Sequence, residues 1–70
     1  MIVNGQERKF KEGITVLELL NDLKIEPTHV AVEVDLDIVD KDKFEVTKLD
    51  SSSKVEIIRF VGGGWYIIKN

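Results

Sequence analysis

The first stretch of the chain alternates apolar and polar residues and then reverses. Residues 1–3 begin a two-residue repeat that ends at Asn4 and Gly5, a pair suited to the positive φ angles of a tight hairpin turn. Charged residues surround Phe10 in the segment 7–11, as in a strand with one wet face near a sheet edge. The pattern predicts an N-terminal hairpin whose second strand runs through residues 7–11.

A short amphipathic helix is predicted next. Thr15 and Glu18 have the spacing of a capping box, in which each side chain satisfies a free backbone N–H at the helix start. Apolar residues then recur at helical spacing, namely Val16, Leu19, Leu20 and Leu23. Pro27 lacks an N–H and disfavours helical geometry before it, so we expect the helix to be over by Ile25. Lys24 is placed in the last turn, where a cation suits the helix dipole.

The second half of the chain returns to a two-residue period. The apolar positions are Val30, Val32, Val34, Leu36 and Ile38, and they predict a strand with one buried face that runs into a short following strand. Residues 40–53 are irregular, and residues 54–60 form a last strand. Its two faces carry Val55, Ile57 and Arg59 on one side and Glu56, Ile58 and Phe60 on the other.

The predicted order is therefore strand, strand, helix, strand, short strand, strand. One amphipathic helix packed across a four- to five-stranded mixed sheet is the simplest way to bury both the leucine stripe and the valine rows. This is an α+β fold, and the order is compatible with a β-grasp topology. Periodicity alone leaves other α+β arrangements open.

Composition restricts the possible functions. The 70 residues contain 43% hydrophobic and 33% charged residues, typical of one small globular domain, and no apolar run approaches the roughly 20 residues of a membrane-spanning helix. The absence of cysteine excludes a disulfide scaffold, a thiolate metal site and a thiol nucleophile. A net charge of −3 argues against non-specific nucleic-acid binding. The first residues resemble no signal peptide, so we expect a cytoplasmic protein.

The polar residues offer little catalytic chemistry. The acidic run from Glu33 to Asp42 lacks the glycine and the final glutamate of a calcium loop, and we interpret it as a solvated acidic turn. His29 is the sole histidine, which disfavours a metal site or a catalytic triad. The serines have no plausible base. We therefore expect no metal site and no hydrolytic chemistry.

Three consecutive glycines, Gly62, Gly63 and Gly64, follow the last strand. A phosphate-binding loop would require a following Lys, Ser or Thr and a helix, which are missing. Two interpretations remain: a hinge before the apolar run 65–68, or a tail that threads a narrow channel, because a chain without Cβ atoms meets little steric obstruction. The expected division is a β-grasp domain at residues 1–61 and a flexible glycine-rich tail with a C-terminal extension at residues 62–70.

Several segments together resemble one family. They are Val3-Asn4-Gly5, Glu12-Gly13-Ile14-Thr15-Val16 leading into Glu18-Leu19-Leu20, Val30-Ala31-Val32-Glu33, and Val55-Glu56-Ile57-Ile58-Arg59-Phe60-Val61-Gly62-Gly63-Gly64. In this order they are similar to the ThiS family, the ubiquitin-like sulfur carriers of thiamine biosynthesis, over residues 1–64. The small subunit of molybdopterin synthase, which shares the fold and a Gly-Gly end, is the alternative within the class.

The resemblance implies a ubiquitin-like β-grasp domain that acts as a reagent. Such a carrier is not an enzyme, has no catalytic residue of its own and binds no cofactor. Gly64 would be adenylated by a ThiF-like enzyme that uses ATP, converted to a thiocarboxylate, and would donate its sulfur to a ThiG-like thiazole synthase. Gly62 and Gly63 would thread the channel of the activating enzyme together with Gly64. Ile58, Phe60 and Val61 would form a docking patch on a monomeric carrier. For Ile58 and Phe60 the alternative is ordinary sheet packing or cover by the last six residues.

Three departures from the family pattern stand out. Asp35-Leu36-Asp37 replaces an Asn-Gly turn, for which we expect an altered shape, and Ser51-Ser52-Ser53 replaces a Gly-Asp turn. Six residues, Trp65-Tyr66-Ile67-Ile68-Lys69-Asn70, follow the glycine that should carry the free carboxylate. One hypothesis is a precursor extension removed by a processing protease. The other is an added strand on a ubiquitin-like binding module without carrier activity.

Overall fold

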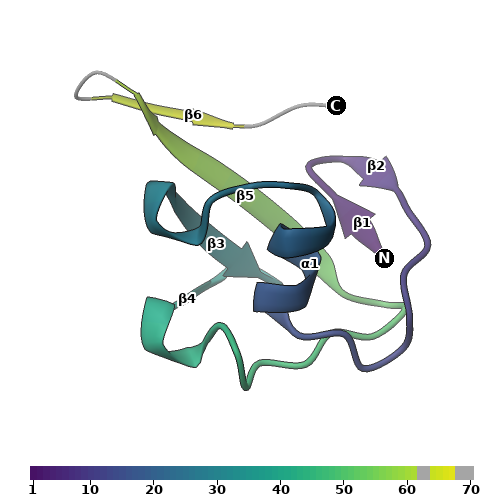
Figure 1. The fold of residues 1–70 in the computed structure, drawn as a ribbon. Helices are drawn as coiled ribbons and strands as arrows, with labels where there is room; N and C mark the ends of the chain where they lie inside the picture. The colour runs from purple at the N-terminus through teal and green to yellow at the C-terminus, as the bar shows by residue number, and fades with distance from the viewer. Residues whose placement is uncertain (62–63, 68–70) are drawn as a thin grey trace.

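The structure, a computed structural model, describes residues 1–61 and 64–67. Its strands are β1 (Ile2–Val3), β2 (Gln6–Glu7), β3 (Val30–Val34), β4 (Asp37–Val39), β5 (Lys54–Val61) and β6 (Gly64–Ile67). Its helices are α1 (Val16–Asp22) and two short 3₁₀ turns, η1 (Pro27–His29) and η2 (Lys41–Lys43). Figure 1 shows β5 as the long central strand, with β6 beside its C-terminal end.

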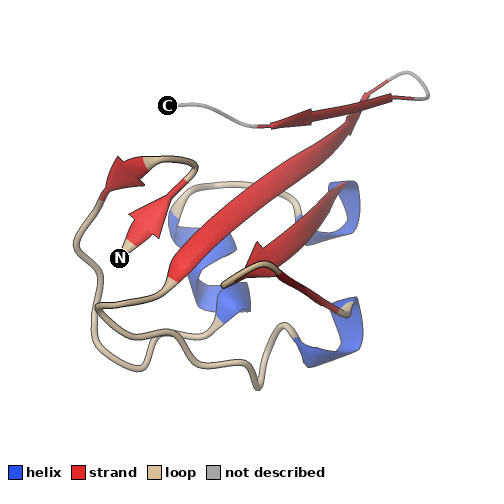
Figure 2. Cartoon of the chain, turned by 180° about the vertical axis from the view of Figure 1, so that it is seen from behind, coloured by secondary structure: helices blue, strands red, loops and turns tan. Residues whose placement is uncertain are grey.

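The strands form one mixed sheet in the order β2-β1-β5-β3-β4, with β6 paired to β5 outside this path. The β1–β5 pair is parallel and the other pairs are antiparallel. The helix α1 packs on one face of the sheet, as the front and back views show (Figures 1 and 2). The predicted α+β fold, one helix on a mixed sheet, is confirmed, and β6 is a further strand that the prediction did not count.

The first hairpin forms, but it is shorter than predicted. Asn4 and Gly5 have φ angles of 49° and 81°, as a type I′ turn requires. The returning strand is β2, only two residues long, and not the segment 7–11. Ile2 and Val3 of β1 pair with Glu7 and Gln6 of β2, so the ladder between the two strands ends at Glu7.

The helix begins as the capping box predicts and ends earlier than expected. The Glu18 N–H donates to Thr15 Oγ1 at 3.1 Å, and the Thr15 N–H donates to Glu18 Oε1 at 2.9 Å. The last helical residue is Asp22, so Lys24 lies beyond the helix at φ 60° and does not close its last turn. The chain leaves the helix through a left-handed residue, which ends helical geometry before Pro27 does.

The β3–β4 hairpin corrects the predicted valine row. Asp35 and Leu36 have φ angles of 52° and 74°, the same left-handed pair that an Asn-Gly turn adopts, so the expected altered shape is not found. The reversal puts Ile38 opposite Glu33, away from the core. Leu36 and Ile38 are 79% and 71% exposed because the turn breaks the alternation that extends through Val34.

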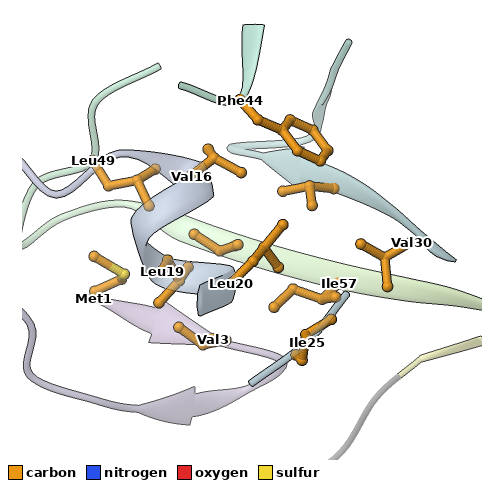
Figure 3. Close-up of a cluster of buried hydrophobic side chains, with 12 residues drawn as sticks. Met1, Val3, Val16, Leu19, Leu20, Ile25, Val30, Phe44, Leu49 and Ile57 are labelled. Carbon is orange, nitrogen blue, oxygen red and sulfur yellow. The ribbon is translucent and has the colours of Figure 1, made fainter. Parts of the chain in front are cut away.

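The core lies between α1 and one face of the sheet (Figure 3). Its buried apolar residues are Met1, Val3, Val16, Leu19, Leu20, Ile25, Val30, Val32, Phe44, Leu49, Val55 and Ile57. They come from α1, from β1, β3 and β5 and from the irregular segment 40–53, together with Met1 before β1 and Ile25 after α1. Packing of this apolar surface stabilises a chain that has no disulfide.

Candidate functional site

The central strand β5 carries the predicted docking residues toward the glycine tail. Val55 and Ile57 are buried beneath α1, so alternation directs Ile58 to the opposite face of the sheet, as predicted. Ile58 is half-buried there and pairs with Ala31 of β3 and Ile67 of β6. Phe60 and Val61 complete the strand. Their role in docking stays a prediction.

Gly64, the predicted attachment residue, is the first residue of β6 and lies opposite Val61 in the ladder. Gly62 and Gly63, the other predicted channel residues, lie outside the described residues, as do residues 68–70. Residues 64–67 therefore have the arrangement of the second sequence hypothesis, an added strand. The predicted domain boundary between residues 61 and 62 stays a prediction.

The side chain of Asn4 reaches from the first hairpin to the middle of β5. Its Oδ1 accepts the Ile57 N–H at 2.7 Å, and its Nδ2 donates to the Ile57 carbonyl at 3.5 Å. The Asn4 N–H donates to the Val55 carbonyl at 2.8 Å. Sequence reasoning assigned Asn4 only to the turn, because nothing near it in the chain indicates a partner 53 residues away.

One member of the acidic run has a structural role. The Asp35 N–H donates to the Lys54 carbonyl at 2.8 Å, and Asp35 Oδ1 accepts the Lys54 N–H at 3.0 Å. These two bonds attach the β3–β4 turn to the beginning of β5. Within the part of the chain that the structure describes, no group of three or more acidic or histidine side chains is placed to hold a metal ion.

Two exposed carboxyl groups have a lowered pKa for local reasons. The Thr15 backbone N–H, as a hydrogen-bond donor, lowers the pKa of Glu18, and the Ser52 hydroxyl does the same for the pKa of Asp50, at 2.7 Å from Oδ1. Both arrangements are turn or cap contacts within a few residues. They stabilise the start of α1 and the turn after Asp50, and they give no indication of a catalytic group.

Membrane insertion has no helical candidate here. Across residues 1–61 and 64–67, no helix has the length and apolarity needed to cross a bilayer.

Comparison with known proteins extends these observations. The profile of the ThiS family matches residues 1–64. The sulfur carrier protein ThiS of Bacillus subtilis is 33% identical, and the match covers 89% of this chain and 96% of that protein. The crystal structure of the thiamine biosynthesis protein ThiS from Geobacter metallireducens superimposes with a TM-score of 0.79 at 32% identity, covering 90% of this chain and 96% of the other.

A third relative is much longer. A thiazole synthase of Paramagnetospirillum magneticum is 39% identical over 64 residues, which are 91% of this chain but 20% of that protein. This chain therefore spans about a fifth of that relative. The family match and the two full-length relatives favour ThiS over the molybdopterin synthase alternative. With its β-grasp fold, the chain belongs to the ThiS family, the sulfur carriers of thiamine biosynthesis.

Proposed function

We propose that this chain carries sulfur as a thiocarboxylate on Gly64. The observation that supports the proposal most strongly is the end of the family match at Gly64, the last glycine after β5. The chain has no cysteine, so a backbone carboxylate takes the place of a thiol as the sulfur-bearing group. The alternative, a binding module with a structural tail, is favoured by the strand β6 and is separated by the experiment below.

The proposed chemistry proceeds in two steps. A carboxylate oxygen of Gly64 attacks the α-phosphorus of ATP, which forms an acyl-adenylate and releases pyrophosphate. A donor at the oxidation state of sulfide then attacks the acyl carbon and displaces AMP, which leaves the thiocarboxylate. A carboxylate is a poor electrophile, and AMP supplies the leaving group that it lacks. The carrier itself supplies the acyl group and no catalytic side chain, so we infer that it is not an enzyme.

The free carboxylate requires removal of the residues that follow Gly64. Hydrolysis of the Gly64–Trp65 peptide bond by a processing protease consumes one water molecule. It leaves a carboxylate on Gly64 and an amino group on Trp65. We propose this cleavage as the step that precedes adenylation.

Two partners follow from this scheme. The first is a ThiF-like adenylating enzyme, which binds the ATP, so the carrier needs no cofactor of its own. The second is a ThiG-like thiazole synthase. A match to about a fifth of a thiazole synthase supports this pairing. The outer face around the half-buried Ile58, followed along β5 by Phe60 and Val61, is the proposed docking surface. The need for ATP favours the cytoplasm, and we propose a monomer as the working form.

The proposal is tested with two forms of the protein, the full chain and a form that ends at Gly64. Each is incubated with ThiF-like enzyme, ATP and sulfide, and its intact mass is measured, after circular dichroism has shown that both are folded. We expect an adenylate or thiocarboxylate only on the form that ends at Gly64. Gly64→Ala in that form should slow the reaction strongly because a Cβ obstructs the channel. No modification of either form contradicts the carrier proposal and favours a binding module.

A further inference from the structure

One edge of β5 is occupied by three different parts of the chain. The Val55 carbonyl accepts the Asn4 N–H, and both backbone groups of Ile57 bind the Asn4 side chain. Backbone groups of a strand alternate between its two edges, so Val55 and Ile57 direct theirs to the β1 side. The same alternation directs the N–H and C=O of Arg59 and Val61 to that edge.

The strand β6 lies where those groups are directed. Arg59 is opposite Tyr66, and Val61 is opposite Gly64. The residues that alternate with these direct their backbone groups to the other edge, where Ile58 lies opposite Ala31 of β3. The edge of β5 is therefore filled in sequence by β1, by the Asn4 side chain and by β6.

This pairing has a consequence for Gly64. A glycine held in the ladder opposite Val61 cannot at the same time extend away from the sheet into a partner's channel. A hydrolytic enzyme likewise needs the bond after Gly64 in an unpaired, locally open segment. The same backbone pairing thus keeps Gly64 from entering a partner's channel and keeps the Gly64–Trp65 bond from a protease.

We propose that β6 is an autoinhibitory latch, paired to Arg59 and Val61, that keeps the full chain in a latent form. The inference rests on the proposed use of Gly64 as the sulfur-bearing residue. The latch is short, with four residues in β6, and a small hairpin is only marginally stable by itself. It therefore opens without unfolding of the core, and the fraction of open chains sets the rate at which the bond after Gly64 is cut.

The latch is tested in the full chain with a matched pair of proline variants. Proline removes one N–H donor. Tyr66→Pro removes an N–H that faces β5. Trp65→Pro removes an N–H that faces away from β5, and an edge strand tolerates proline at such a position. Residue-specific amide hydrogen exchange is measured by NMR at Arg59, with Ile58 as the internal reference because its N–H faces β3.

We expect Tyr66→Pro to accelerate exchange at Arg59 by about tenfold or more, the effect of losing one hydrogen bond. Trp65→Pro should stay within about threefold of the wild type, and exchange at Ile58 should be unchanged in both variants. Equal exchange at Arg59 in the wild type and Tyr66→Pro overturns the latch. This measurement needs no partner enzyme, so its failure is distinct from failure of the carrier proposal.

A second measurement tests the functional consequence. A broad-specificity protease is added to the full chain, and cleavage after Gly64 is followed by mass spectrometry. Tyr66→Pro should be cut at least about tenfold faster than the wild type, because cleavage tracks the open population. Ile67→Pro is the control, since Ile67 pairs with Ile58 at a position whose N–H faces away from β5. Cleavage of the wild type as fast as Tyr66→Pro contradicts the latch.

Discussion

The side chain of Asn4 pairs with the backbone of Ile57 as a strand residue would, with Oδ1 2.7 Å from the Ile57 nitrogen. It lies on the edge of β5 between the two residues of β1 and Ile67 at the end of β6. A turn residue in the first hairpin thus supports the strand that leads to Gly64. The Asn4 side chain thus extends the contact between the N-terminal hairpin and β5 beyond the β1–β5 ladder.

Replacement of Asn4 tests this contact. Asn4→Gly keeps the left-handed turn but leaves the Ile57 N–H without its acceptor, so we expect a loss of about 1–2 kcal/mol in the free energy of unfolding. Asn4→Asp retains the acceptor and should cost less than Asn4→Gly. Urea denaturation measures both, with exposed Asn21→Ala as the control. An Asp variant less stable than the Gly variant contradicts the assigned role of Oδ1.

Lys24 holds a left-handed conformation at the end of α1. Its N–H donates to the Asn21 carbonyl at 3.1 Å, and the Ile25 N–H donates to the Leu20 carbonyl at 2.9 Å. These are the two bonds of a Schellman motif, whose left-handed position favours glycine. Lys24→Gly should therefore raise the free energy of unfolding by about 0.5–1 kcal/mol.

The control for this substitution is Lys9→Gly, which lies outside the helices and strands and does not have a positive φ angle. It should not stabilise the protein, because glycine there only increases the freedom of the unfolded chain. Thermal denaturation of both variants gives the comparison. If Lys24→Gly lowers the Tm as much as Lys9→Gly does, strain at Lys24 is not relieved and the explanation is wrong.

The corrected hairpin predicts which apolar residues matter for stability. Leu20 is fully buried between α1 and the sheet, so Leu20→Ala should cost about 3 kcal/mol through lost burial and a cavity. Ile38 is 71% exposed, and Ile38→Ala should change stability by less than about 0.5 kcal/mol. Similar losses for the two variants, measured by urea denaturation, would restore the sequence prediction that Ile38 faces the core.

Docking through the outer face is tested at Ile58. Ile58→Ser removes apolar surface opposite the core, and we expect it to weaken binding to thiazole synthase by about tenfold. Leu36→Ser is the control, because Leu36 is 79% exposed on the β3–β4 turn. Calorimetry gives both Kd values. An unchanged Kd for Ile58→Ser, with a changed Kd for Leu36→Ser, would move the docking surface to the turn.

Lowering the pH below about 5 should decrease the stability of the folded protein. The pKa values of Glu18 and Asp50 are lowered in the folded state from their ordinary 4.5 and 3.8, so the unfolded chain takes up protons first as the pH falls. Their contribution to stability is complete above about pH 5 and is lost as the pH falls through the lowered values. The urea midpoint should therefore decrease from about pH 5 to about pH 3. The double variant Glu18→Gln and Asp50→Asn should show a smaller decrease, and an equal decrease argues against this origin.

The sequence by itself determined two features that depend on near neighbours. The Asn4-Gly5 turn and the capping box of Thr15 and Glu18 follow from contacts between residues a few positions apart. The helix stripe and the alternation of β5 identified the buried residues that hold α1 on the sheet. The resemblance over residues 1–64 supplied the family, and the family profile covers the same residues.

Only the tertiary structure decided where distant segments meet. The turn at Asp35 and Leu36 placed Ile38 outside the core, although its spacing in the chain matched the buried valines. The bonds from the Asn4 side chain to Ile57 and the pairing of β6 with β5 both use backbone groups of β5, which are the same in every residue and leave no pattern in the sequence. The physical reason is that residue order encodes side-chain burial, whereas the open edge of a strand is filled by whichever segment the fold brings to it.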